Sequence, residues 1–381
     1  MARITEIYFT KGSRTGENER AENREGIRMT EVRVNARDLA RFAAELFKRG
    51  GLSDEDARVV AEDLVEANLR GVDSHGVSRI PAYLERIRRG LLNPRPQIKV
   101  KRITPAASLV DGDDGMGFLA AHRAMDEAVE LAKTSGIGLV GVHRSSHFGM
   151  AALYVRQALT AGYISLVFTN ASPAIPVWGG RTAFLGTSPL AAGVPAGKEQ
   201  PFVMDMAMAV IARGKIRLAA MHGEPIPPGL ALDKDGNPTT DPRKAFEGVC
   251  LPFGGHKGAA LAMLMDLLAG VFTGANFGGE VKNFHSDHSA PQNVGHLMIA
   301  MRPDLFMTRE RFEDRMDTFV SRVKSQPRAQ GFEEILMPGE PEDRKAEERR
   351  RTGIPLSEKV VRMLREEALR YGLTPETDIF R

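Results

Sequence analysis

Residues 136–170 read GIGLVGVHRSSHFGMAALYVRQALTAGYISLVFTN, and this stretch decides the fold class. An apolar strand is predicted over 137–142, and a polar cluster follows it at 144–149. A helix is predicted over 150–161 and a second strand over 164–169. A strand, a helix and another strand in this order are typical of an α/β layer.

The same alternation extends outward over residues 94–300. Strands are predicted at 98–103 and 107–111, followed by a helix over 120–134. Both ends of the chain read instead as helices, at 34–47, 53–69, 77–87 and 357–371, with Ser53 as an N-cap. We therefore predict an α/β middle flanked by helical ends.

The composition is that of an ordinary folded protein, with 27% charged and 42% hydrophobic residues among 381. The 52 lysines and arginines nearly balance 49 acids, so no nucleic-acid partner is expected. Cys250 is the single cysteine, which excludes a disulfide scaffold and a thiolate zinc site. It also fits a reducing, cytoplasmic setting.

The N-terminus and the longest apolar run argue against a membrane partner. Residues 1–28 lack the apolar core of a secretory signal, and their charge predicts a mobile extension. The run at 258–275 carries Asp266 in its middle, where a charge is costly in lipid. We predict a buried core helix there.

The common nucleotide-binding motifs are not matched. GDDGMG at 112–117 reverses the spacing of G-x-G-x-x-G and lacks the downstream acid, so a glycine-rich turn is favoured. A phosphate-binding loop of the form G-x-x-x-x-G-K-[ST] is also missing from the sequence. These observations argue against a standard Rossmann or P-loop domain.

Two short stretches concentrate groups that can do chemistry. If VDSHGVSRIPAY at 72–83 is helical, then His75, Arg79 and Tyr83 share one face, and the guanidinium suits a carboxylate. His147 follows a strand, where α/β folds place sites and a neutral imidazole can act as an acid or base. A solvated helix face and a histidine satisfied by a tight turn are equally weighted alternatives.

The remaining candidates are weaker. Glycine-containing loops at 185–189 and 254–258 suit close approach to a ligand, and Lys257 could hold a phosphate, but each alone is more often a turn. His285, Asp287 and His288 invite a metal, although their spacing matches no known motif. We predict no metal site and keep a metal-dependent hydrolase as a remote alternative.

Together and in this order, the motifs resemble the malate/L-lactate dehydrogenase family, whose cofactor domain lacks a Rossmann fold. The resemblance covers residues 29–374. It rests on RGVDSHGVSR at 70–79, RSSHFGMAALY at 144–154, TNASP at 169–173, LGTSPLA at 185–191, FVMDMA at 202–207, GGHKGAALAML at 254–264, MPGE at 337–340 and GIPL at 353–356.

The resemblance implies an oxidoreductase that uses NAD or NADP and acts on a small 2-hydroxy or 2-oxo acid, malate-like or lactate-like. It implies an α/β (α+β) fold, with a central mixed-sheet cofactor domain at 96–304. A discontinuous helical domain would come from 29–95 and 305–381. It also implies a homodimer with the site near the subunit interface.

The resemblance assigns roles to residues of this sequence. His147 is the implied proton acceptor or donor, and Ser74, His75, Arg79 and Tyr83 are implied to contribute to the substrate pocket. Within that pocket we expect Arg79 to bind the substrate carboxylate and His75 and Tyr83 to orient the carbonyl. The implied cofactor contacts are Asn170, Ala171, Ser172, Thr187, Asp205, Met206, Ala207, His256, Lys257, Gly339 and Glu340.

Two alternatives stay open beside the hydrolase. The same proton donor and carboxylate clamp would serve an NADPH-dependent reductase of cyclic imine-2-carboxylates. A nucleotide-binding protein without turnover is the other, and only an activity measurement separates it from an enzyme.

Overall fold

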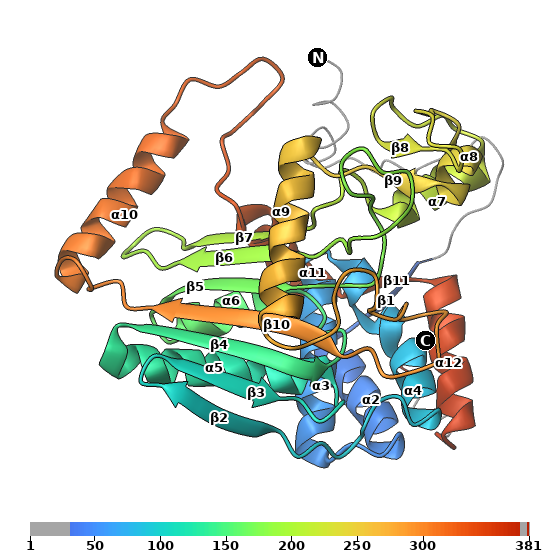
Figure 1. Cartoon of the computed structure of the whole chain (residues 1–381), viewed down its shortest axis with the longest axis horizontal. Coiled ribbons are helices and arrows are strands. Elements are labelled where there is room, and N and C mark those ends of the chain that lie inside the picture. Colours follow the sequence, from blue (N-terminus) through green and yellow to red (C-terminus); the bar gives the residue numbers. More distant parts are fainter. Residues whose placement is uncertain (1–30, 374–378, 381) are drawn as a thin grey trace.

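The computed structural model describes residues 31–373 and 379–380, so the predicted extension at 1–28 lies outside the described residues. A mixed seven-stranded sheet of order β2-β3-β4-β10-β5-β6-β7 is at the centre (Figure 1). β3 and β4 are parallel, and the other neighbours are antiparallel. The strands are β2 (Lys99–Thr104), β3 (Ala107–Asp111), β4 (Ile137–Ser145), β5 (Ile164–Thr169), β6 (Leu190–Val194), β7 (Phe202–Met206) and β10 (Val294–Met301).

Helices cover both faces of this sheet because its central strands β4, β10 and β5 are apolar on both sides. Val167 and Met298 belong to the main core, whereas their neighbours Phe168 and Leu297 belong to a separate cluster on the other face. α5 and α6 cover the first face and α9 crosses the second (Figure 1). These helices are α5 (Gly117–Ser135), α6 (Ala152–Thr160) and α9 (His256–Asp266).

The two ends of the described chain form one helical layer. β1 (Glu31–Val34) pairs antiparallel with β11 (Ile354–Ser357), which ties the ends together. Arg88 also forms an ion pair with Glu367, more than 270 positions later. The helices of this layer are α2 (Ala36–Arg49), α3 (Asp54–Leu69), α4 (Ile80–Arg88), α11 (Glu340–Thr352) and α12 (Glu358–Arg370).

Local signals fix several element ends as predicted. The Ser53 hydroxyl accepts a hydrogen bond from the Asp56 N–H and begins α3. α5 ends at Gly136, whose φ of 77° is open to glycine at little cost. The strand predicted at 164–169 is observed with the same bounds.

The stretch at 73–83 is not one continuous helix. Two short 3-10 turns, Asp73–His75 and Val77–Arg79, precede α4, whose N-cap residue is Arg79. The cause is Asn68, whose amide accepts from the Val77 N–H and would clash with any side chain at Gly76. His75, Arg79 and Tyr83 therefore meet through tertiary structure and not through helical spacing.

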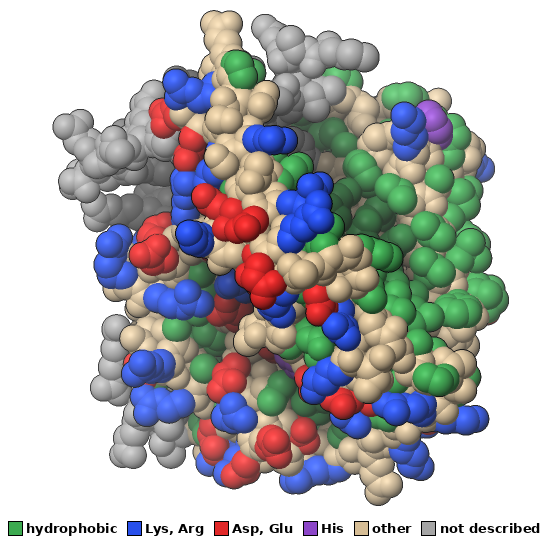
Figure 2. All heavy atoms as spheres, turned by 90° about the vertical axis from the view of Figure 1, so that its left-hand side faces the viewer, with side chains coloured by type: hydrophobic (Ala, Val, Ile, Leu, Met, Phe, Trp, Pro, Cys, Tyr) green, Lys and Arg blue, Asp and Glu red, His purple; other side chains and the backbone are tan. Residues whose placement is uncertain are grey.

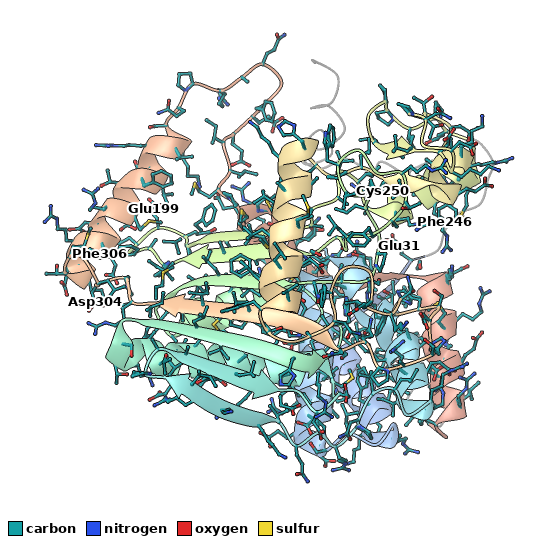
Figure 3. The ribbon with its side chains drawn as sticks, viewed as in Figure 1. Glu31, Glu199, Phe246, Cys250, Asp304 and Phe306 are labelled. Carbon is teal, nitrogen blue, oxygen red and sulfur yellow. The ribbon has the colours of Figure 1, made fainter. Side chains whose placement is uncertain are left out.

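Two parts extend away from the sheet. α10 (Arg309–Lys324) is joined to it through Asp317, which accepts from three backbone N–H groups at 197–199. Phe306, just before α10, is 93% exposed (Figure 3).

The other part has its own small core around the buried Cys250 and contains α7 (Arg213–His222), α8 (Pro242–Glu247), β8 (Ala231–Leu232) and β9 (Val249–Cys250). The predicted domain bounds stay predictions.

The apolar run at 258–275 is not the buried helix that the sequence predicts. It forms α9 and a π turn, Leu267–Val271, with apolar side chains that face outward. Figure 2 shows hydrophobic side chains gathered on the side that carries α9. We call these exposed side chains the α9 face: Met263, Leu264, Leu267, Val271 and Phe272. No helix in the described ranges is long and apolar enough to span a membrane.

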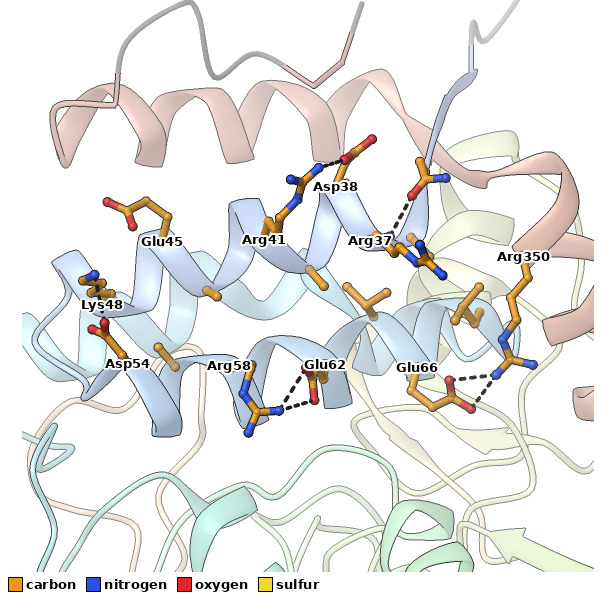
Figure 4. A pocket seen from close by; sticks show the side chains of 17 residues that line it. Arg37, Asp38, Arg41, Glu45, Lys48, Asp54, Arg58, Glu62, Glu66 and Arg350 are labelled. Atoms are coloured by element: carbon orange, nitrogen blue, oxygen red, sulfur yellow. Dashed lines mark hydrogen bonds and ion pairs between the residues drawn. The ribbon is translucent and has the colours of Figure 1, made fainter.

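A groove between α2 and α3 is lined mainly by charges that already have partners (Figure 4). Arg58 pairs with Glu62, Lys48 with Asp54, and Arg350 with Glu66, while alanines line the space between the helices. We interpret it as a solvated surface, because paired exposed charges of this kind are common and weak.

Candidate active site

The ends of β4, β5 and β7 and the starts of β6 and β10 lie side by side along one end of the strands, as their register shows. We call this side of the sheet, which runs across the strands, the shared edge. Phe168 near the end of β5 pairs with Leu190 at the start of β6, which pairs with Met206 at the end of β7. On the other side, His296 near the start of β10 pairs with Thr169, and β4 ends beside it. The loops that follow or precede these ends, at 145–149, 170–172, 187–189 and 206–208, therefore share one edge.

His147 lies in the loop after β4 and is held from both sides. Its Nδ1 is 2.5 Å from the Tyr83 hydroxyl of α4, and the Gly149 N–H donates to the same nitrogen at 3.2 Å. The His147 side chain is half-buried, whereas Tyr83 is fully buried. With Nδ1 engaged, Nε2 is the ring nitrogen left for chemistry.

His75 and Arg79 complete a cluster on the helical side. The His75 ring stacks on that of His147 at 5.5 Å, and the Ser74 hydroxyl lies 3.0 Å from the His75 Nδ1. Arg79 donates from Nε to the Ser74 carbonyl at 2.6 Å. The structure thus brings together all five residues implied for catalysis and substrate binding.

Burial and positive charge keep the imidazoles of this cluster neutral. Burial, with help from the nearby guanidinium of Arg79, lowers the pKa of His147 well below its usual range. The same two causes lower the pKa of His75 to about 3. A neutral ring beside a cation is suited to receive an anionic substrate.

Two further residues belong to this cluster: Phe284, which the sequence reasoning missed, and His285, which it considered only as a metal ligand. Phe284 packs on Tyr83 and His147, with ring centroids 4.7 and 5.2 Å apart, and the His285 Nε2 is 3.3 Å from an Arg79 nitrogen. The fully buried Arg86 holds their loop by donating to the Asp287 and Ala290 carbonyls. The only sequence signal was the HSDH motif itself, which suggested a metal.

The surroundings of His285 do not suit a metal. Its Nε2 faces the guanidinium of Arg79, and a cation there would be repelled. Asp287 accepts instead from Ser289 and faces Lys282. Within 31–373 and 379–380, no group of three or more histidine, cysteine, aspartate or glutamate side chains is arranged to hold a metal ion.

The residues implied for the cofactor at 170–172 and 187 lie at the shared edge. The Asn170 side chain is buried and used internally, since it accepts from the Gly295 N–H and donates to the Asn276 carbonyl. Ala171, Ser172 and Thr187 are half-buried. Asn170 therefore shapes this edge, and its neighbours offer groups to a ligand.

The 205–207 segment and the start of α9 are joined to the same edge. The Met208 N–H donates to the Thr187 carbonyl, and the Phe253 N–H donates to the Met208 carbonyl, which brings 254–257 near. Asp205 accepts from the Ala152 N–H at the start of α6, while Met206 is half-buried and Ala207 exposed.

The α9 N-terminus has the features of an anion cradle. His256 and Lys257 are exposed in its first turn, and the N-cap residue is Gly255, which has no side chain that could cap the first N–H groups of the helix. Gly254 has a φ of 59° and open space where a Cβ would be. Free N–H groups at a helix start, with a lysine beside them, fit a nucleotide phosphate.

Gly339 and Glu340 lie along the outer edge of β7, the strand that ends at Asp205 and Met206, and their role in cofactor binding stays a prediction. The Val203 N–H donates to the Pro338 carbonyl, and a Cβ at Gly339 would be 2.8 Å from Val203. The buried Glu340 carboxylate accepts from the Met337 N–H and pairs with Lys324 at 2.6 Å. No contact of the described residues joins this pair to His147 or Lys257.

The model of the family described as malate/L-lactate dehydrogenase matches residues 34–365. The malate/(S)-sulfolactate dehydrogenase of Methanothermus fervidus is 40% identical over 83% of this chain and 91% of its own length. The NAD(+) ureidoglycolate dehydrogenase of Escherichia coli K12 is 32% identical over 91% and 98%. The (2R)-3-sulfolactate dehydrogenase (NADP(+)) of Chromohalobacter salexigens is 36% identical over 72% and 82%.

Solved structures of similar proteins have the same fold as this chain. The sulfolactate dehydrogenase of Methanocaldococcus jannaschii matches with a TM-score of 0.86 and 38% identity, covering 90% of this chain and 98% of that one. The delta1-piperideine-2-carboxylate reductase of Pseudomonas syringae matches with a TM-score of 0.77 and 30% identity, covering 88% and 99%.

Proposed function

Because this chain belongs to the malate/L-lactate dehydrogenase family and is an NAD(P)-dependent 2-hydroxyacid dehydrogenase, we propose that His147 is its proton-transfer group. The observation that carries this proposal is the engagement of Nδ1 by Tyr83 and Gly149, which leaves Nε2 for the substrate oxygen. The substrate is a small malate-like or lactate-like 2-hydroxy or 2-oxo acid.

Arg79 is the group proposed to bind the substrate carboxylate. It is half-buried beside His147, its Nε is fixed by the Ser74 carbonyl, and one terminal nitrogen faces His285. The planar guanidinium can offer two parallel N–H groups to a carboxylate. His75, stacked on His147, is placed to orient the adjacent carbonyl or hydroxyl oxygen.

The cofactor is proposed to lie along the shared sheet edge, between the 170–172 loop and the start of α9. Lys257 and the free N–H groups beside it would hold a phosphate, and the 205–207 segment would line the path toward His147. NAD or NADP, when bound, supplies the hydride acceptor or donor. In oxidation, His147 takes the substrate hydroxyl proton on Nε2, and in reduction it returns it.

The test follows nicotinamide absorbance with NADH and NADPH in parallel, against a panel of 2-oxo acids and cyclic imine-2-carboxylates. Turnover of pyruvate, oxaloacetate or a sulfonated 2-oxo acid is the expected result. Turnover of a cyclic imine alone would replace this substrate class with the reductase alternative, which the Pseudomonas syringae structure favours. Nucleotide binding without any turnover would contradict the proposal.

We also propose that the chain forms a homodimer through the α9 face. Five apolar side chains are exposed there, and contiguous patches of this kind usually mark contacts between proteins. Leu267→Glu should convert the dimer to a monomer in analytical ultracentrifugation, because a buried unpaired charge opposes association. Glu310→Lys on α10 is the charge-changing control. A monomeric wild type would refute this proposal.

A further inference from the structure

The Tyr83 hydroxyl is buried among aromatic rings. Phe47, Phe118 and Phe284 surround the Tyr83 ring at centroid distances of 6.3, 5.6 and 4.7 Å. Among the residues that the structure describes, His147 is its hydrogen-bond partner, at 2.5 Å. Any effect of this buried hydroxyl on the reaction must therefore pass through its hydrogen bond to His147.

The second group at the His147 Nδ1 can only donate. The Gly149 N–H points at this nitrogen from 3.2 Å, so it favours a ring whose Nδ1 lacks a proton. A neutral ring then carries its proton on Nε2. A phenol hydroxyl differs from an amide, because its oxygen can also accept a hydrogen bond.

Oxidation of a 2-hydroxy acid needs the opposite ring form. Nε2 must be unprotonated to receive the hydroxyl proton as C2 loses its hydride to the oxidised nicotinamide. Before this step the ring therefore releases its Nε2 proton to solvent and takes up one proton on Nδ1, with no net change in its charge. The products are then the 2-oxo acid, the reduced cofactor and an imidazolium with protons on both nitrogens. Throughout this step Nδ1 needs an acceptor.

The charged groups around His147 offer no such acceptor. Arg79 and His75 face it from the two 3-10 turns, His285 from the loop before β10, and His296 from β10. None of these groups is a carboxylate, and the three rings are engaged elsewhere. His75 stacks face to face on His147, the His285 Nε2 faces Arg79, and both His296 nitrogens face the hydroxyls of Thr169 and Ser145. The Tyr83 oxygen is left as the acceptor for an Nδ1 proton.

We propose that Tyr83 is the positioning residue that lets His147 carry a proton on Nδ1, by turning its hydroxyl from donor to acceptor. This inference rests on the proposed role of His147 in proton transfer. Tyr83 is thereby a group that acts on His147, and its full burial separates it from the substrate.

The chain offers a matched control for testing this. Tyr154 is also fully buried, and its hydroxyl donates over 2.5 Å to the Phe148 carbonyl instead of a titratable ring. Tyr83→Phe and Tyr154→Phe remove one equally buried hydroxyl each. Tyr83→Phe should lower kcat of oxidation about 10- to 100-fold with KM nearly unchanged, less than the ~10²–10⁴-fold of a whole acid–base group. Tyr154→Phe should keep kcat within about twofold.

A second readout needs neither substrate nor cofactor. In protein with ¹⁵N-labelled histidines, the His147 resonances are assigned by their loss in His147→Gln. Tyr83→Phe should move the Nδ1 resonance toward that of an unbonded nitrogen and lower the His147 pKa further, because the cation loses its acceptor. Tyr154→Phe should change neither.

Unchanged His147 resonances in folded Tyr83→Phe, or equal kinetic effects of the two variants, would overturn the inference. If Tyr83→Phe does not fold, 3-fluorotyrosine at position 83 weakens the oxygen as an acceptor without removing it, and a smaller shift in the same direction is expected. Full activity of His147→Gln would refute the proposed function itself. Inactive His147→Gln with unaffected Tyr83→Phe would refute only this inference.

Discussion

His122 and His147 are both partly buried, and their surroundings shift their pKa values in opposite directions. The His122 nitrogens face two acceptors at 2.7 Å, the Asp63 carboxylate and the Gln157 amide oxygen. Burial opposes its charge, but the hydrogen bond and charge of Asp63, with Gln157, more than offset burial and raise the pKa of His122. Burial is the main cause that lowers the pKa of His147, and the Arg79 cation lowers it further, with no carboxylate to offset them.

The difference teaches what separates a structural histidine from the proposed proton-transfer histidine in this fold. His122 on α5 joins α3 to α6, and the Asp63 carboxyl favours its protonated form. His147 has no such partner, so its protonation is free to change when an anion arrives. Burial alone does not distinguish the two, whereas the charge of the neighbours does.

The largest expected effect comes from removing the reactive ring. His147→Ala should lower kcat by ~10²–10⁴-fold, the usual contribution of a general acid–base group, while nucleotide affinity is nearly unchanged. Steady-state kinetics and a nucleotide titration measure the two quantities. His122→Asn serves as the control and should keep kcat within a few-fold. Loss of nucleotide binding together with turnover would make the role of His147 structural.

Asp63→Asn tests the structural member of the comparison. The free energy of unfolding should fall by about 1.5–3 kcal/mol, because the hydrogen bond between the His122 ring and the buried Asp63 carboxyl, which raises the His122 pKa, is weakened. Urea denaturation measures this loss. Glu62→Gln changes a neighbouring acid in an exposed pair with Arg58 and should cost less than about 0.5 kcal/mol. If Asp63→Asn and Glu62→Gln lowered the free energy of unfolding equally, the contact between His122 and Asp63 would not be a structural one.

Arg79→Lys separates the charge near His147 from the shape of the carboxylate site. Lysine keeps the positive charge but cannot present two parallel N–H groups, so KM should rise about tenfold, or roughly 1.4 kcal/mol. The pH dependence of kcat/KM should keep its form because the charge is retained. An unchanged KM would remove Arg79 from the carboxylate site.

The smallest effect is a difference in how stability depends on pH. Burial lowers the pKa of His296 to about 3, so below pH 6.5 only the unfolded chain takes up this proton and stability falls. Between pH 7.5 and 6.0, His296→Gln should therefore lose about 0.8 kcal/mol less stability than the wild type.

His122 should behave in the opposite way. Because its pKa is raised in the folded protein, His122 contributes fully to the free energy of unfolding below pH 6.5, and this contribution is lost as the pH rises through the raised pKa. Between pH 7.5 and 6.0, His122→Asn should therefore lose more stability than the wild type. Denaturation of both variants across this pH range measures the signs. Changes of the same sign would contradict the comparison.

Much of the fold was accessible from local patterns. The strand at 164–169, the Ser53 cap of α3 and the helical chain ends follow from periodicity and capping, which depend on neighbours within a few residues. The residues singled out at 74–83 and 144–149 do converge. Their convergence through two 3-10 turns could not be predicted, because it depends on Asn68 from the preceding helix.

The sequence by itself determined the alternation of strands and helices, the motifs of the family and the presence of an imidazole and a guanidinium suited to hydroxy-acid chemistry. Only the tertiary structure decided that Tyr83 holds His147, that His285 faces Arg79 and that α9 turns apolar side chains outward. The physical reason is that a local pattern reports which side chains avoid water or carry charge. Which partner they meet depends on chain segments tens to hundreds of residues away, or on a second molecule.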